Sequence, residues 1–214
     1  MPAIQNKTAL SMTENNLIFG PVGRNSAHLC VDMQRMFAEP TEWMMPWWAK
    51  VLPHITALVI FQPEKTIFTR FIPARRAGQG HGMWKQYYER WASMTVEKIG
   101  ADMLELVPAL ARYTPPASVI DKHVYAPWLE TELHQRLKRQ GIDTLIISGG
   151  ETDVCVLATV LGAVDLGYRV VLAKDALCSS SDAAHDAAID LYHQRYSLQV
   201  EPVDTETILR NWSR

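Results

Sequence analysis

The stretch TLIISGGETDVCVLATVL, Thr144–Leu161, decides the fold of this chain. An apolar run, two glycines and a run of helix-forming residues follow one another, which predicts a buried strand, a tight turn and a helix. We expect Thr152 to be the N-cap residue of that helix, so that Cys155 falls in its first turn. Backbone N–H groups and the helix dipole favour a thiolate there. The sequence therefore predicts either a reactive cysteine or a small residue packed between helix and sheet.

Five other apolar runs predict further strands of one sheet. The runs are continuous rather than alternating in polarity, which indicates strands covered on both faces, and longer helical stretches separate them as in βαβ units. The six expected strands are His28–Val31, Thr66–Thr69, Ser118–Ile120, Leu145–Ser148, Val170–Ala173 and Leu198–Val200. This pattern predicts an α/β fold built on a mainly parallel, Rossmann-like sheet.

The stretches between the expected strands predict helices. Gly141 and Gly167 are expected to end two of them in short loops. The segment Phe71–Gly100 breaks the rhythm with glycines and aromatic residues, which is typical of a binding loop or lid. The expected helices are Trp47–Phe61, Met103–Tyr113, Pro127–Gln140, Asp153–Leu166, Ser181–Tyr192 and Asp204–Trp212.

Length and composition indicate one domain without a concentration of positive or negative charge. A chain of 214 residues can bury one core, and a formal net charge of −2 with interspersed charges predicts no nucleic-acid or membrane partner. Three cysteines form no disulfide framework or zinc spacing, and neither a signal peptide nor a membrane-spanning run is recognisable. We expect residues 1–26 to form an N-terminal extension, residues 27–214 a single domain, and the protein to be cytoplasmic with a small-molecule or protein partner.

Three reactive side chains follow expected strands. Asp32 comes after the first strand, Lys122 after the third and Cys155 after the fourth. Ligands of parallel sheets bind outside the carboxyl ends of the strands, so a carboxylate, an ammonium and a thiol are expected at one edge. Singly, Asp32 would be read as a turn residue and Lys122 as a solvated side chain. Together they predict a nucleophilic site.

These positions resemble the signature segments of the isochorismatase-like cysteine hydrolases. The matching segments are Val31–Gln34, Asp121–Trp128 and Gly149–Val156, in the family's order and at its usual spacing. The resemblance extends from about Ala27 to Val203. It implies an α/β/α sandwich around a six-stranded parallel sheet, which agrees with the strand count above.

The resemblance also implies a role for each reactive residue. Cys155 would be the nucleophile, Asp32 the general acid and base, and Lys122 a supporting cation. The peptide bond Gly150–Glu151 would be cis, and the backbone N–H groups of Glu151 and Cys155 would form an oxyanion hole. The implied reaction is hydrolysis of a C–N bond in a small amide, ureido or carbamoyl compound through a Cys155 thioester.

The chain departs from some members of the resembled family. Nicotinamidases carry a metal-binding Asp-x-His after the second strand, whereas Phe68–Pro73 contains neither residue, and His81 is an isolated candidate. We therefore expect no metal and no cofactor. Members that cleave the vinyl ether of isochorismate do not use the cysteine, so Cys155 together with Asp32 and Lys122 favours C–N hydrolysis. Vinyl-ether hydrolysis and a non-catalytic interaction protein with this fold are the alternatives.

Candidate substrate-binding residues lie near the expected cleft. Arg70 could pair with a substrate carboxylate or remain solvated. Trp84, like Tyr87 and Trp91, could wall the pocket or pack in a core or interface. The full candidate set is Gln34, Phe37, Arg70, Trp84 and Tyr125. The many aromatic residues also predict a homo-oligomer, a dimer or a tetramer.

Overall fold

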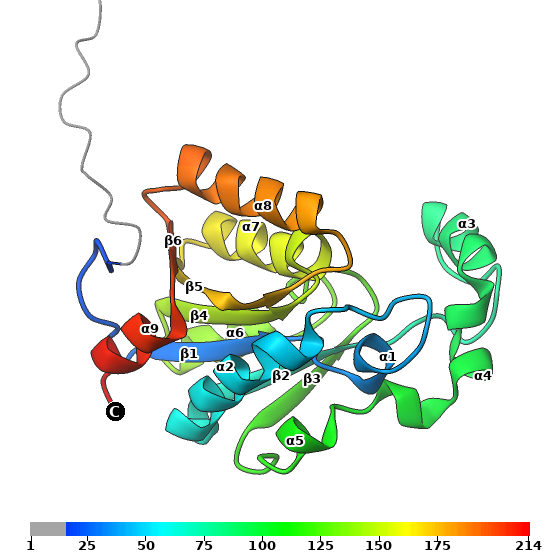
Figure 1. Ribbon diagram of the computed structural model, residues 1–214, viewed down its shortest axis with the longest axis horizontal. Helices are drawn as coiled ribbons and strands as arrows, with labels where there is room; N and C mark the ends of the chain where they lie inside the picture. The colour runs from blue at the N-terminus through cyan, green and yellow to red at the C-terminus, as the bar shows by residue number, and fades with distance from the viewer. Residues whose placement is uncertain (1–15) are drawn as a thin grey trace, which may run out of the picture.

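Six parallel strands form one sheet in the computed structural model, which describes residues 16–214 (Figure 1). The strand order is β3-β2-β1-β4-β5-β6, and every neighbouring pair is parallel. The strands are β1 (Ser26–Val31), β2 (Thr66–Phe71), β3 (Ser118–Lys122), β4 (Thr144–Gly150), β5 (Arg169–Cys178) and β6 (Val200–Val203). The predicted α/β fold is confirmed. The last strand is a correction, since it begins where the expected strand Leu198–Val200 ends.

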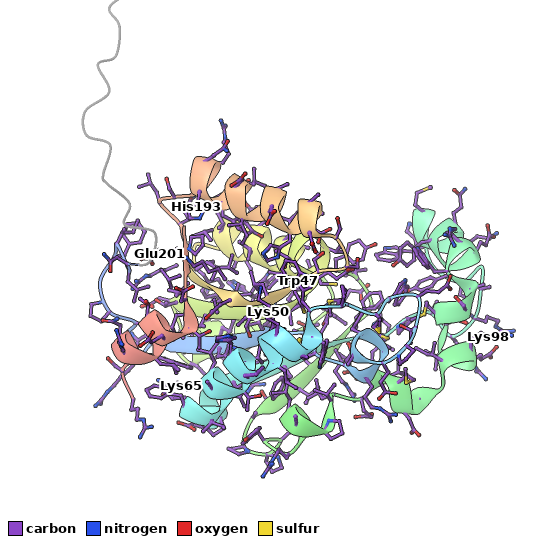
Figure 2. All side chains as sticks on the ribbon, viewed as in Figure 1. Trp47, Lys50, Lys65, Lys98, His193 and Glu201 are labelled. Atoms are coloured by element: carbon purple, nitrogen blue, oxygen red, sulfur yellow. The ribbon has the colours of Figure 1, made fainter. Side chains whose placement is uncertain are left out.

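Helices cover both faces of the sheet (Figure 1). One core contains side chains of α2 (Trp48–Phe61) and α9 (Thr205–Asn211), and the other contains side chains of α6 (Leu133–Arg139), α7 (Leu157–Asp165) and α8 (Asp182–Arg195). Strand β1 contributes side chains to both cores, because Cys30 belongs to the first core while Leu29 and Val31 belong to the second. Side chains fill the space between the layers (Figure 2). The result is a three-layer α/β/α sandwich.

Shorter elements join the layers. Two of them, Ala101–Leu104 and Pro108–Ala111, lie where one longer helix was predicted. The expected helix Met103–Tyr113 contains only short elements, and its α-helical part begins at Pro108, which suits a first helical position because proline lacks an N–H group. The short elements are α1 (Arg35–Ala38), η1 (Pro63–Lys65), α3 (Met83–Arg90), η2 (Ala92–Met94), α4 (Val96–Ile99), η3 (Ala101–Leu104), α5 (Pro108–Ala111) and the π-helical η4 (Thr152–Val156).

The helix expected from Pro127 begins only at Leu133. Thr131 explains the late start, because its hydroxyl donates to the Pro127 carbonyl at 2.6 Å and accepts from the Leu133 N–H at 3.1 Å. Such local side-chain bonds compete with helix formation. The predicted helix ends at Gly141 and Gly167 are confirmed, with φ values of 67° and 85° that glycine adopts without strain.

About half of the segment expected as a loop or lid, Phe71–Gly100, is helical. It contains α3, η2 and α4, which lie beyond one end of the sheet together with α1 (Figure 1). Backbone bonds fasten its two halves to each other, since Val96 donates to Ala74 at 3.1 Å and Glu97 donates to Arg75 at 3.0 Å. This helical segment is therefore placed to cover the ends of the strands.

Both ends of the described chain pack on the sheet domain. Val22 is fully buried and pairs with Trp212, and the Phe19 N–H donates to Glu201. The expected extension of residues 1–26 lies partly outside the described residues, and its described part joins the core at Val22. Within residues 16–214, no helix has the length and apolar character needed to cross a membrane.

Candidate active site

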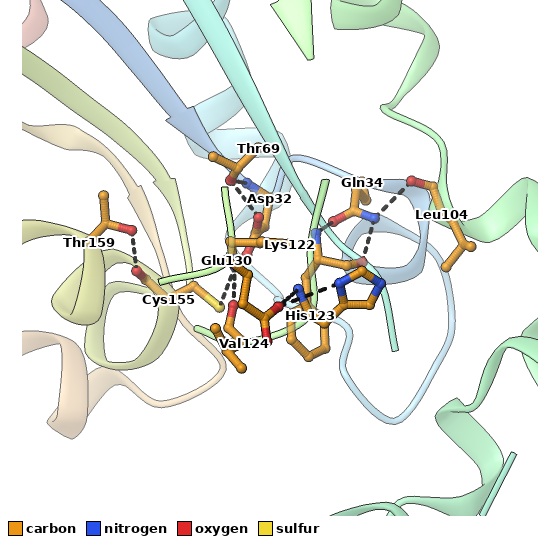
Figure 3. A network of polar contacts seen from close by, with 11 residues as sticks. Asp32, Gln34, Thr69, Leu104, Lys122, His123, Val124, Glu130, Cys155 and Thr159 are labelled. Atoms are coloured by element: carbon orange, nitrogen blue, oxygen red, sulfur yellow. Dashed lines mark hydrogen bonds and ion pairs between the residues drawn. The ribbon is translucent and has the colours of Figure 1, made fainter. Parts of the chain in front are cut away.

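Asp32, Lys122 and Cys155 meet at the carboxyl ends of three strands (Figure 3). The Lys122 Nζ atom is 2.6 Å from Asp32 Oδ2 and 3.5 Å from Cys155 Sγ. Asp32 and Lys122 are fully buried, and Cys155 is 6% exposed. Because β1 pairs directly with β4, and β2 alone separates it from β3, the parallel register brings positions distant in the chain together.

Asp32 is held by its backbone and by a threonine. Its φ of 51° lies in the left-handed region, which Asp tolerates better than most residues. The Thr69 hydroxyl donates to Asp32 Oδ1 at 2.6 Å, while Lys122 binds the other oxygen. Both carboxylate oxygens therefore have partners. The sequence reasoning missed Thr69, although a threonine inside the apolar run of β2 is a signal that could have drawn attention to it.

Lys122 is a buried cation with several partners. Its ammonium also donates to the Val124 carbonyl at 3.3 Å and lies 5.1 Å from the centroid of the Phe71 ring. Burial lowers the pKa of Lys122, but the facing Asp32 carboxylate and the Cys155 sulfur outweigh burial and hold this pKa above its ordinary value. Lys122 is therefore charged at neutral pH.

The turn before Cys155 differs from the predicted helix start. Glu151, not Thr152, occupies the N-cap position, and Thr152–Val156 forms a π-helical turn ahead of α7. The Thr152 hydroxyl donates instead to the Cys178 carbonyl at 3.1 Å and lies 2.9 Å from His185 Nδ1. The predicted N-cap was wrong because these tertiary partners, absent from the local sequence, engage the hydroxyl.

The predicted resting thiolate also needs correction. Burial and the nearby Asp32 carboxylate raise the pKa of the Cys155 thiol well above its ordinary value, although the Lys122 ammonium acts in the opposite direction. The sulfur is therefore a protonated thiol at neutral pH. Asp32 is close enough to hydrogen-bond it and can serve as the acceptor of its proton.

The two glycines before Glu151 are tightly enclosed. A Cβ atom at Gly150 would lie 2.5 Å from Met45 Sδ and 3.0 Å from Cys178 Sγ, so a larger residue would require the Met45 side chain to move. The peptide bond Gly150–Glu151 is cis. Cys178 ends β5 and is fully buried, because β5 extends beyond the expected strand Val170–Ala173.

A cavity of about 250 Å³ opens onto Cys155. Two of the predicted substrate-binding residues, Phe37 and Tyr125, line it. Sequence reasoning left the roles of Trp43, Tyr87 and Trp91 open and missed some lining residues that carry no local motif. The other lining residues are Glu42, Trp43, Phe71, Tyr87, Trp91, Glu151, Val154 and Ser180.

Gln34 and Trp84, two further substrate-binding predictions, are not among the residues that line this cavity. The buried Gln34 amide accepts from the Phe71 N–H at 2.6 Å and donates to the Phe71 carbonyl at 3.0 Å. Trp84 packs behind the wall, with its ring centroid 5.0 Å from that of Tyr125. Both residues therefore contact side chains or backbone of the cavity wall, and their contact with a substrate stays a prediction.

Arg70 is engaged with acidic side chains. Its guanidinium makes a bidentate pair with Asp121, at 2.7 and 2.9 Å, and binds Glu105 at 2.8 Å. Arg70 does not line the cavity. The contact of Arg70 with a substrate carboxylate stays a prediction, and in this structure two neighbouring carboxylates pair with its charge.

A larger cavity of about 540 Å³ lies elsewhere, against α8 and β6. Its lining includes His193 and Glu201, which Figure 2 labels. Glu201 is ion-paired with Arg169 at 2.7 Å. The smaller cavity is the better candidate for a reaction because Cys155 forms part of its wall. Within residues 16–214, no three His, Cys, Asp or Glu side chains are grouped to hold a metal ion.

Comparison with known proteins identifies the family. The isochorismatase domain matches residues 26–206, and the chain belongs to the isochorismatase family. It is 33% identical over 89 residues to the uncharacterized isochorismatase family protein YwoC of Bacillus subtilis, a match that covers 42% of this chain and 47% of YwoC. The chain thus spans about half the length of this relative. A probable inactive nicotinamidase of Arabidopsis thaliana is 27% identical over 170 residues, 78% of this chain and 87% of the relative.

Solved structures share the fold. A cysteine hydrolase from Pseudomonas syringae has a TM-score of 0.75 at 23% identity, with 87% of this chain and 92% of that chain covered. The N-carbamoylsarcosine amidase of Thermoplasma acidophilum has a TM-score of 0.68 at 21% identity, with 85% of this chain and 96% of that chain covered. These similarities concern the fold.

Proposed function

We propose that this protein is a cysteine hydrolase that cleaves the C–N bond of a small amide, ureido or carbamoyl compound. The observation that carries the proposal is the contact of one buried ammonium, Lys122 Nζ, with both Asp32 and Cys155 at the base of a cavity. A nucleophile, a base and a cation in hydrogen-bonding reach form the arrangement needed for covalent catalysis. The name of the structural neighbour N-carbamoylsarcosine amidase lends support to a C–N substrate.

In the first half of the proposed reaction, Asp32 takes the proton of the Cys155 thiol as the sulfur attacks the carbonyl carbon. The C=O bond becomes a C–O⁻ bond, and we propose that the backbone N–H groups of Glu151 and Cys155 donate hydrogen bonds to this oxyanion. Each such donor typically lowers the activation barrier by about 3 kcal/mol. Asp32 then gives its proton to the leaving nitrogen, the C–N bond breaks, and ammonia or an amine departs from a thioester.

In the second half, water replaces the departed amine. Asp32 accepts a proton from the water while the water oxygen attacks the thioester carbon. The C–S bond then breaks. The proton returns to the sulfur, which regenerates the thiol and releases the acid. Lys122 stays charged throughout and stabilises the negative charge that moves between Asp32 and Cys155.

The test is ammonia release from a panel of amides, ureides and carbamoyl amino acids. The Cys155→Ala variant should lose this activity, and mass spectrometry of the native protein should show an acyl adduct on Cys155. Cys30→Ala is the matched control, because Cys30 is equally buried but lies in β1 and does not line the cavity. This variant should retain activity.

The same assays test the alternatives. Pyruvate release from isochorismate that persists in Cys155→Ala would identify a vinyl-ether hydrolase. Full amide hydrolysis by Cys155→Ala would refute the thioester mechanism. A native protein that turns over no member of either panel and forms no adduct would support a non-catalytic family member.

A further inference from the structure

The wall of the cavity is mostly aromatic. Trp43 lies at its centre, with its ring centroid 6.0 Å from each of the Phe71, Tyr87 and Trp91 centroids. The faces of aromatic rings attract cations through their quadrupoles, and quaternary ammonium groups are recognised by cages of such rings. We call this set the aromatic wall; its six members are Phe37, Trp43, Phe71, Tyr87, Trp91 and Tyr125.

Two rings of the aromatic wall already contact cations of the protein itself. The Lys122 ammonium lies 5.1 Å from the Phe71 centroid, and the Arg90 guanidinium lies 4.6 Å from the Trp91 centroid. Neither cation is among the residues that line the cavity. These contacts show that rings of the aromatic wall already lie next to positive charges in this protein.

The charged groups of the lining are carboxylates. Glu42 accepts a hydrogen bond from the Ser93 hydroxyl, and Glu151 accepts from the Ser180 N–H at 3.0 Å and from the Ser180 hydroxyl. These bonds tie each carboxylate to a serine in another segment. Among the described residues that line the cavity there is no lysine, arginine or histidine. The two nearby cations of the strand ends, Lys122 and Arg70, are paired with acids.

We infer that the cavity selects a small amide that carries a positive charge, above all a methylated ammonium group, over a neutral or an anionic amide. An anionic substrate would approach Glu42 and Glu151 without an arginine to bind it. A methylated ammonium instead offers a diffuse charge and an apolar surface, both of which suit the aromatic wall. The turnover part of this inference rests on the proposed function, whereas the binding part does not.

Three amides of similar size provide the test of binding. Trimethylammonioacetamide is cationic, 3,3-dimethylbutanamide replaces its nitrogen by carbon and is neutral, and malonamate is anionic. Calorimetric titration of the Cys155→Ala protein at low salt should show at least tenfold tighter binding of the cation than of its neutral isostere, and no binding of malonamate. Equal binding of the first two amides, tighter binding of malonamate, or binding of none would overturn the inference.

A surface variant tests the contribution of the carboxylates. Glu42→Gln should weaken binding of the cationic amide by roughly three- to tenfold and leave the neutral isostere unchanged. Glu89→Gln is the matched control, since Glu89 is an exposed residue of α3 that does not line the cavity. A Glu42→Gln protein that keeps its circular dichroism spectrum and the full preference for the cation would contradict a role of Glu42.

Turnover by the native protein separates this inference from the proposed function. Selective binding of the cationic amide without ammonia release from any amide would support the inference and refute the hydrolase. Ammonia release from malonamate or 3,3-dimethylbutanamide at least as efficient as from the cationic amide would support the hydrolase and refute the inference. A preference of at least tenfold in kcat/KM for the cationic amide supports both.

Discussion

The Asp32 carboxylate, the Lys122 ammonium and the Cys155 thiol share one buried site, and their charges constrain one another. Asp32 and Lys122 form a neutral pair at 2.6 Å. A thiolate in the same site would add a net negative charge away from water, which is costly. In the proposed reaction, the thiol therefore keeps its proton until a substrate carbonyl can accept the negative charge.

Replacement of Asp32 should change the rate of amide hydrolysis and the rate of Cys155 alkylation in opposite directions. In Asp32→Asn, amide hydrolysis should fall by about 10²–10⁴, the typical contribution of a general acid and base. The pKa of Cys155 should also fall, because Asp32 helps to raise it. Alkylation of Cys155 by iodoacetamide at pH 7 should therefore become faster, by roughly tenfold for each unit of pKa lost.

Both rates can be measured on the same protein preparation, with alkylation followed by mass spectrometry of the Cys155 peptide. The Glu39→Gln variant is a suitable control, since Glu39 is a partly exposed acid paired with Arg35. It should change neither rate. Slower alkylation in folded Asp32→Asn would mean that Asp32 activates the resting thiol, contrary to the direction of the pKa shift.

Lys122 allows stability to be separated from chemistry. Lys122→Met leaves the buried Asp32 carboxylate without its cation, and breaking such a pair typically costs about 3–5 kcal/mol. The double variant Asp32→Asn with Lys122→Met removes both charges and should recover much of this stability. Urea unfolding of the two variants measures the difference.

Ammonia release should be lost in both Lys122 variants, whatever their stability. A double variant no more stable than Lys122→Met would show that the ammonium contributes through packing rather than through its pairing with Asp32. Amide hydrolysis at the native rate in the double variant would remove both charged groups from the mechanism.

At the scale of elements, the end of β4 fixes the distance between Asp32 and Cys155. Gly149 has a φ of 110° and approaches β1 so closely that a Cβ atom would lie 2.1 Å from the Val31 carbonyl oxygen and 2.7 Å from its nitrogen. These obstacles are backbone atoms, which cannot move aside as a flexible side chain could. Asp32 directly follows Val31, so any separation of β1 from β4 also displaces the carboxylate.

Gly149→Ala should therefore be strongly destabilising. We expect a loss of at least about 3 kcal/mol in the free energy of unfolding, in the range of severe backbone and packing defects. The matched control is Gly141→Ala, which has a φ of 67° but open space around its Cβ position, and which should cost only about 1–2 kcal/mol of backbone strain. Urea unfolding gives both values, and equal losses would contradict the argument from the contact with Val31.

The sequence predicted the strands better than the helix starts. Buried parallel strands are continuous apolar runs, and their signal is local. The start at Leu133 depends on the hydroxyl of Thr131, and the turn before Cys155 depends on partners of Thr152 that are 26 and 33 residues away. Single hydroxyl contacts of this kind, whether local or distant, leave no periodic pattern in the sequence.

At the scale of the whole molecule, the meeting of Asp32, Lys122 and Cys155 could be predicted from the sequence, whereas most residues of the cavity wall could not. Asp32, Lys122 and Cys155 follow apolar runs, and the topology of a parallel sheet brings such positions to one edge. The cavity wall instead depends on how α3 packs against the strand ends. Arg70 illustrates the limit, since its pairing with Asp121 arises from the β2 and β3 register, which opposes these two residues.

The three buried cysteines predict how the stability of the whole domain responds to alkaline pH. Burial raises the pKa of the Cys30 thiol to about 12 and also raises the pKa values of Cys155 and Cys178. Above pH 8.5 or so, the unfolded chain releases these protons while the folded protein keeps them, so the free energy of unfolding must decrease. Each thiol contributes up to about 1.4 kcal/mol per pH unit.

Urea unfolding under reducing conditions at pH 8, 9 and 10 measures this slope. The buried tyrosines and Lys122, whose pKa values are also raised, add to it as the pH nears 10, and the comparison with Cys30→Ala cancels their contribution. Cys30→Ala should be less stable than the native protein at pH 8 because it leaves a small void, but its stability should decline less steeply with pH. The two curves should therefore converge as the pH rises. A stability independent of pH between 8 and 10, or parallel curves for the two proteins, would mean that Cys30 titrates alike in the folded and unfolded states and is not shielded by the sheet.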